Sequence, residues 1–149
     1  MTPKDHPAAA SVAEEPETLP FWTKLAYFLM IAGMAIPVLT GVVTFLLGQA
    51  PMSQWVLMLH VGASPLFSAG LALLAIAWSA NRAPVDYPTR LVLWSVLVIG
   101  IVVVLSGVVP MTPVFGTEGQ HALYLLHRWS AVLLTALVGL HLWRLRAGR

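Results

Sequence analysis

The sequence predicts an all-α integral membrane protein, a four-helix bundle of up-down-up-down topology, and three observations indicate this fold class. Of the 149 residues, 58% are hydrophobic and only 9% are charged, whereas soluble domains carry about 25% charged residues. No Asp, Glu, Lys or Arg occurs in three long runs, 25–81, 91–117 and 129–143. These runs are apolar on all sides, which argues against a soluble helical bundle with polar outer faces.

The charge-free runs predict four membrane-spanning helices. A span needs about 20 apolar residues, and the first run is long enough for two spans divided by a polar turn at 48–53. We expect helices over residues 21–48, 53–80, 90–109 and 121–145. The longest connection is then 110–120. In the third helix, small residues predict close contacts within the bundle; they are Ser95, Gly100, Ser106 and Gly107.

The chain is expected to divide into a tail and one domain. Residues 1–19 are rich in Pro, Ala and acidic residues, so we expect a disordered tail. This tail lacks the positive region and short apolar core of a signal peptide. Residues 20–149 form the transmembrane domain.

Basic residues near the helix ends predict the orientation. They are Lys24, Arg82, Arg90, Arg144, Arg146 and Arg149. Cytoplasmic loops carry an excess of Lys and Arg, so both termini and the 81–90 connection are expected in the cytoplasm. The 49–53 and 110–120 connections then face the opposite side. For a bacterial protein this side is the periplasm, and the membrane is the inner (cytoplasmic) membrane.

Three histidines lie within the expected spans. His127 and His141 are fourteen residues apart on one apolar stretch, a separation of about 1400° of helical turn and about 21 Å of rise. Both rings therefore face nearly the same way, near opposite edges of the hydrocarbon core. His60 lies about as deep in the second helix as His127 lies in the fourth, so these two rings could meet across the bundle. A histidine inside a membrane is costly and needs a partner.

The His60–His127 pair predicts bis-histidine ligation of a b-type haem, because imidazoles from facing helices hold haem in membrane bundles. Gly62 is small enough to let a flat macrocycle approach the backbone. The alternative is two unrelated histidines that bind backbone carbonyls or line a proton path. Zinc is poorly supported, because no third or fourth ligand lies at that depth. The absence of cysteine excludes iron–sulfur ligation by this chain and covalent haem attachment.

Arg128 follows His127 directly and lies near the outer end of the fourth helix. A charged side chain that faces lipid is costly. Two interpretations stay open: the guanidinium pairs with a haem propionate, or it extends to the outer surface of the membrane.

At this point the motifs resemble a known family. They are Leu126-His127-Arg128-Trp129-Ser130-Ala131, Leu140-His141-Leu142-Trp143-Arg144, Leu59-His60-Val61-Gly62 and Leu39-Thr40-Gly41. Together they resemble the four-helix di-haem cytochrome b subunits that anchor formate dehydrogenases, nickel–iron hydrogenases and related respiratory enzymes. The resemblance extends over residues 24–145.

The resemblance implies an outer haem held by His60 and His127, and an inner haem held by His141 and a histidine near the start of the first helix. This sequence departs from the family pattern at the last position, where Tyr27 stands instead. The resemblance therefore implies one haem b, with a second possible.

Three interpretations of the inner site stay open. Tyr27 could ligate iron as a phenolate, as in catalase. Met30 or Met34, which lie on the same helical face as Tyr27, could supply His/Met ligation together with His141. Alternatively the inner haem is absent, and Tyr27 and His141 lie near a quinone head group.

The expected function is a membrane electron-transfer subunit that is not a catalyst on its own. It would pass electrons between an extracytoplasmic partner, which is another subunit of a redox complex or a periplasmic carrier, and the quinone pool. Membrane lipid surrounds it, and no nucleic-acid partner is expected. The alternative is a haem-free membrane anchor or quinone-binding subunit of a respiratory complex. A proton-coupled transporter is disfavoured, because the spans lack acidic groups and broken-helix pairs.

Overall fold

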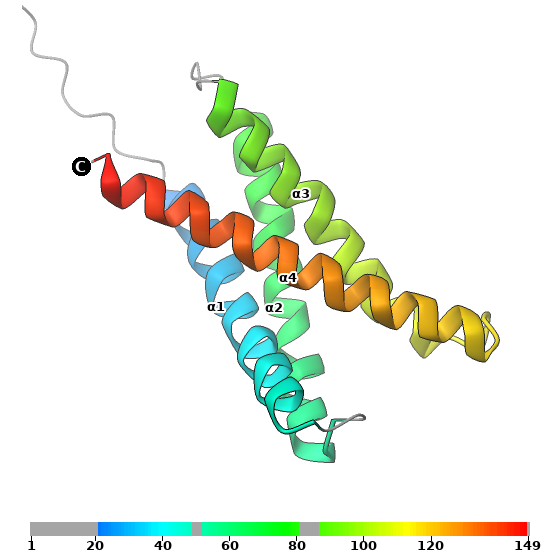
Figure 1. The fold of residues 1–149 in the computed structure, drawn as a ribbon. Coiled ribbons are helices and arrows are strands. Elements are labelled where there is room, and N and C mark those ends of the chain that lie inside the picture. The colour runs from blue at the N-terminus through cyan, green and yellow to red at the C-terminus, as the bar shows by residue number, and fades with distance from the viewer. Residues whose placement is uncertain (1–20, 49–51, 81–86, 149) are drawn as a thin grey trace, which may run out of the picture.

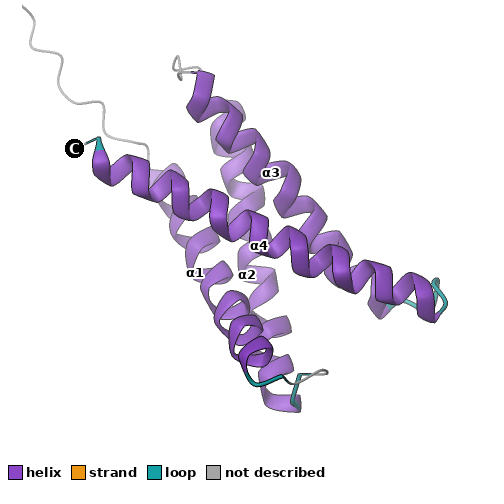
Figure 2. Cartoon of the chain, viewed as in Figure 1, coloured by secondary structure: helices purple, strands orange, loops and turns teal. Residues whose placement is uncertain are grey.

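Four long helices make up the computed structural model, which describes residues 21–48, 52–80 and 87–148. The helices are α1 (Phe21–Leu46), α2 (Gln54–Ala80), α3 (Tyr87–Val108) and α4 (Thr117–Ala147), and a short 3₁₀ turn, η1 (Val109–Met111), follows α3. The described part of the chain contains no strand (Figure 2). The predicted all-α four-helix class is confirmed, whereas the predicted tail at 1–19 lies outside the described residues.

Each of the four helices is long and apolar enough to cross a membrane. Large apolar side chains are exposed along their outward faces, including Leu46 (75% exposed) and Trp55 (76%). Soluble monomers rarely expose apolar surface on this scale, whereas lipid covers it without cost. The chain is therefore a multi-pass membrane protein.

The helix ends differ from the predicted ones by a few residues. α4 begins at Thr117, four residues before the predicted start, and η1 occupies part of the predicted 110–120 connection. Apolarity marks only the hydrocarbon core, and the helix continues beyond it. Glu118 in its first turn favours this extension, because a negative charge stabilises the helix N-terminus. At the end of α1, Gly48 has a φ of 62°, the left-handed conformation that commonly terminates helices.

The four helices form two antiparallel hairpins, α1–α2 and α3–α4, which cross one another (Figure 1). The first hairpin is very tight at two glycines. A Cβ atom on Gly33 would lie 2.3 Å from the backbone nitrogen of Phe67, and one on Gly70 would lie 2.3 Å from that of Met30. Small residues allow such backbone approach in membranes, where packing rather than the hydrophobic effect drives helix association.

A buried apolar cluster joins the two hairpins. Its members come from all four helices and are Ala26, Met30, Phe67, Leu71, Leu74, Val96, Leu97, Leu134 and Val138. A Cβ atom on Gly100 of α3 would lie 2.7 Å from the Leu71 side chain of α2, so the predicted close contact of the third helix within the bundle is confirmed. On α4, the cluster members Leu134 and Val138 lie between His127 and His141.

Candidate functional site

His60 of α2 and His127 of α4 lie next to one another on one side of the apolar cluster. Their ring centroids are 6.0 Å apart, and the ring planes are inclined by 65°. Both side chains are half-buried. The pair joins the two hairpins, since each hairpin contributes one ring. We refer to these residues as the His pair.

The second nitrogen of His127 is held by α3. Its Nδ1 lies 3.0 Å from the carbonyl oxygen of Val103, and a carbonyl can only accept, so Nδ1 carries the proton and donates it. A neutral imidazole then has its free lone pair at Nε2. The Ser106 hydroxyl lies 3.4 Å from the same Nδ1. A Cβ atom on Gly107 would approach the His127 ring to 3.2 Å, so this glycine leaves room for the imidazole.

His60 is held in the corresponding way by α1. Its Nδ1 lies 2.9 Å from the Thr40 hydroxyl oxygen. Both imidazoles therefore use Nδ1 within the protein. Metal-ligating histidines are almost always held by such a hydrogen bond from the other ring nitrogen.

The spacing of the His pair fits two ligands on opposite sides of one metal ion. An imidazole nitrogen binds a metal at about 2 Å and the ring centre lies about 1 Å behind it, so two such rings have centroids roughly 6 Å apart. Within the described ranges, no three His, Cys, Asp or Glu residues cluster as a metal site. A zinc site takes three or four protein ligands, whereas haem iron takes only axial ligands from the protein. The donor set thus fits a haem.

Two further predicted site residues lie apart from the rings of the His pair. The guanidinium carbon of Arg128 is 4.6 Å from the Phe45 ring centroid, a cation–π contact between α4 and α1 that the sequence analysis did not anticipate. Gly62 is exposed, and a Cβ atom there would meet no described atom within 4 Å. It lies about 200° around α2 from His60, so the structure does not bring it to the pair.

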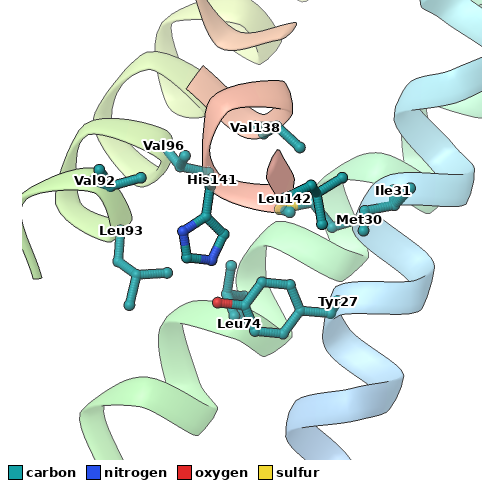
Figure 3. A pocket seen from close by; sticks show the side chains of 10 residues that line it. All are labelled: Tyr27, Met30, Ile31, Leu74, Val92, Leu93, Val96, Val138, His141 and Leu142. Atoms are coloured by element: carbon teal, nitrogen blue, oxygen red, sulfur yellow. The ribbon is translucent and has the colours of Figure 1, made fainter. Parts of the chain in front are cut away.

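On the other side of the apolar cluster, Tyr27 of α1 faces His141 of α4. Their ring centroids are 6.3 Å apart and the ring planes are inclined by only 12°. Figure 3 shows both side chains at one pocket, with the Tyr27 hydroxyl on the side of its ring toward His141. We refer to these residues as the Tyr–His pair.

The pocket at the Tyr–His pair is otherwise apolar. Its remaining lining residues are Met30, Ile31, Leu74, Val92, Leu93, Val96, Val138 and Leu142. The cavity measures about 10 Å³, enough for about one water molecule. Met30 lines it, whereas Met34 packs against the apolar cluster.

The Tyr–His pair does not fit a second haem of the kind that the His pair fits. A neutral phenol is a weak iron ligand, and an apolar pocket disfavours the charged phenolate. Of the two methionines considered as substitutes, only Met30 is among the described residues that line the pocket. Tyr27, Met30 and His141 come together here, but mainly as packed side chains.

The sequence analysis did not assign Thr40 or Val103 to the site. Thr40 and His60 are each ten residues from position 50, the midpoint in sequence between the end of α1 at Leu46 and the start of α2 at Gln54. An antiparallel hairpin brings together residues equidistant from its turn, as it also does for Met30 and Gly70, each twenty residues away. This register could have predicted from the sequence that Thr40 lies opposite His60. A main-chain carbonyl such as that of Val103 has no sequence signal.

No protein-family model, curated protein or solved structure matches the chain. Its function is therefore inferred from the side chains described above.

Proposed function

We propose that the chain is a membrane electron-transfer subunit that holds one haem b between His60 and His127. The observation that carries this proposal is the His pair itself: two imidazoles from different hairpins, with centroids 6.0 Å apart and each Nδ1 engaged by the protein. When bound, the haem supplies one-electron exchange between ferric and ferrous iron.

The protein side chains supply position and environment for that exchange. His60 and His127 would both bind the iron, so no position would stay open for a substrate, which suits electron transfer rather than catalysis. The apolar cluster of the bundle and the surrounding lipid exclude water from one side of the site. The resemblance to the di-haem cytochrome b subunits supports the same proposal.

The proposed electron path joins an extracytoplasmic redox partner to the quinone pool. The partner is another subunit of a redox complex or a periplasmic carrier. The second candidate function is a haem-free anchor or a quinone-binding subunit. It is favoured by the Tyr–His pair, which offers a hydroxyl and an imidazole at one otherwise apolar pocket, the kind of site that binds small ligands.

In the proposed orientation, the chain lies in the bacterial inner membrane with both termini in the cytoplasm, because basic residues gather at those ends. The chain contains no cysteine, so single cysteines report topology without background. A membrane-impermeant thiol reagent applied to intact cells should label Thr117→Cys but not Gly148→Cys. The reverse pattern would invert the orientation.

A pyridine haemochrome assay on the purified protein, with haem counted per chain, tests the proposed function. We expect one haem b per chain and a low-spin reduced spectrum. A colourless protein that is nevertheless folded would exclude the electron-transfer proposal and favour the haem-free anchor.

A further inference from the structure

We propose that Thr40 is a positioning residue for the haem ligand His60: its hydroxyl oxygen accepts a hydrogen bond from Nδ1–H and thereby influences both the orientation of the imidazole and the electron affinity of the iron. This inference rests on the proposed function. Thr40 lies on α1 and His60 on α2, so the contact acts across the hairpin.

The direction of the hydrogen bond follows from the neighbours of the hydroxyl. Thr40 Oγ1 lies 2.8 Å from the Ile36 carbonyl oxygen and 3.0 Å from that of Pro37. Carbonyl oxygens can only accept, and the hydroxyl has one hydrogen. We assign that hydrogen to a carbonyl, because His60 also forms a backbone hydrogen bond with Pro37, whose carbonyl can only accept. The lone pairs of the hydroxyl oxygen then face His60 Nδ1 at 2.9 Å. His60 therefore donates from Nδ1, and Nε2 keeps the lone pair that a metal needs.

The main chain fixes the position of Thr40. The tight backbone approach at Gly33 and Gly70 sets the register of α1 against α2, which places position 40 opposite position 60. The Thr40 hydroxyl is thus carried by a helix whose register against α2 is fixed by these two glycines, and not by a loop.

The two ligands of the His pair differ in how their second nitrogen is held. His127 donates to the main-chain carbonyl of Val103, which no side-chain substitution removes. The closest partner of His60 is a side-chain hydroxyl at 2.9 Å, beside a backbone hydrogen bond with Pro37. A substitution of Thr40 therefore changes how the His60 ring is held, while His60 itself remains in place as a ligand.

A lost acceptor has a defined chemical consequence. The hydrogen bond at Nδ1 increases the basicity of the ligating nitrogen, which favours ferric over ferrous iron. Thr40→Val keeps the shape of the side chain but removes the closest acceptor of the imidazole N–H. We expect the midpoint potential to rise. A tenfold change in the ferric-to-ferrous preference corresponds to about 59 mV for a one-electron couple.

The experiment compares haem-loaded wild type with three variants. Thr40→Val removes the acceptor and Thr40→Ser retains it. Thr44→Val is the matched control, because it removes a hydroxyl one turn away on the same helix. Midpoint potential, low-spin EPR g-values and the rate of haem transfer to excess apomyoglobin are measured for each. Substitution of groups that hold metal ligands typically lowers metal affinity about 10- to 100-fold.

We expect Thr40→Val to raise the potential, shift the EPR g-values and lose haem about tenfold faster, whereas Thr40→Ser and Thr44→Val stay close to wild type. If Thr40→Val does not accumulate in membranes, Thr40→Ala repeats the test with a smaller side chain. Equal potentials and haem loss in wild type and Thr40→Val would remove the role of Thr40 and leave the haem proposal standing. Equal shifts in Thr40→Val and Thr44→Val would indicate a general disturbance and also overturn it. A wild type without haem would overturn both proposals.

Discussion

The His pair and the Tyr–His pair are built on the same helix, yet their surroundings differ. α4 contributes His127 to one and His141 to the other, fourteen residues apart on nearly one face. At the His pair, the neighbouring helices supply hydrogen-bond acceptors from Thr40 and Val103. At the Tyr–His pair, the pocket is lined by aliphatic side chains and Met30, and little space is left.

On the proposed function, this difference indicates which membrane histidines become haem ligands. His127 and His141 both lie near an edge of the hydrocarbon core and on nearly the same face of α4, so neither property distinguishes the two residues. The distinguishing feature is an opposite imidazole together with a held second nitrogen, which fixes the tautomer and the ring orientation. The predictions below test this distinction, from the largest expected effect to the smallest.

The largest effect is expected for the ligands of the His pair. Because haem iron held by two imidazoles loses half of its axial ligation with either change, His60→Ala and His127→Ala should each abolish the low-spin spectrum. Haem content per chain and the reduced α-band are the measurements. His121→Ala is the control, since His121 is exposed on the same helix as His127. A full spectrum in both ligand variants would refute the assignment.

A smaller effect, shared by both pairs, is expected from the α1–α2 contact. Gly33→Ala places a Cβ atom 2.3 Å from the Phe67 backbone nitrogen, so the helices must separate, at a cost of about 1–3 kcal/mol for overpacking. Since α1 carries both Thr40 and Tyr27, haem retention and thermal stability should fall together. Gly139→Ala is the control, because a Cβ atom there meets no described atom within 4 Å. Equal stability of the two variants would contradict the tight contact.

Apolar run length predicted the four helices correctly, because lipid demands a continuous apolar stretch for each span. It did not predict the ends, since α4 continues to Thr117 through polar residues that no hydropathy pattern marks. The third helix was correctly expected to pack closely within the bundle, because small residues permit backbone approach.

The candidate site could be predicted only in part. The helical period and the depth of each span place His60 near His127, and the resemblance to the di-haem cytochrome b subunits places Tyr27 opposite His141. The acceptors were not accessible in this way. A carbonyl such as that of Val103 is present at every position of every sequence, and the contact between Arg128 and Phe45 depends on how the two hairpins cross.

Converting the Tyr–His pair into a second His pair should produce a gain of moderate size. Tyr27→His would place an imidazole opposite His141, whose ring centroid lies 6.3 Å from that of Tyr27, so the haem count should rise above that of wild type. Without a Thr40-like acceptor at this pocket, we expect incomplete occupancy. Tyr124→His is the control, since Tyr124 is 51% exposed on α4. An unchanged haem count in Tyr27→His would show that opposite imidazoles alone do not make the site.

The smallest effect is expected for His141→Ala. His141 lies about 21 Å along α4 from His127, beyond the apolar cluster that includes Leu134 and Val138. On the one-haem proposal, this variant therefore keeps its full haem content and low-spin spectrum, and any loss is confined to quinone reactivity. The haem content per chain is measured separately from quinone reactivity, which is followed as the rate of haem oxidation by a soluble quinone analogue.

The opposite outcome for His141→Ala is equally specific. Two haems in wild type that fall to one in this variant would refute the one-haem count and make His141 a ligand after all. Met30 would then be the described methionine placed to complete the site, because it lines the same pocket, and Met30→Leu would remove the thioether while keeping the volume. Loss of the second haem in Met30→Leu would establish His/Met ligation. Its retention would leave the Tyr27 phenolate, which a high-spin spectrum identifies.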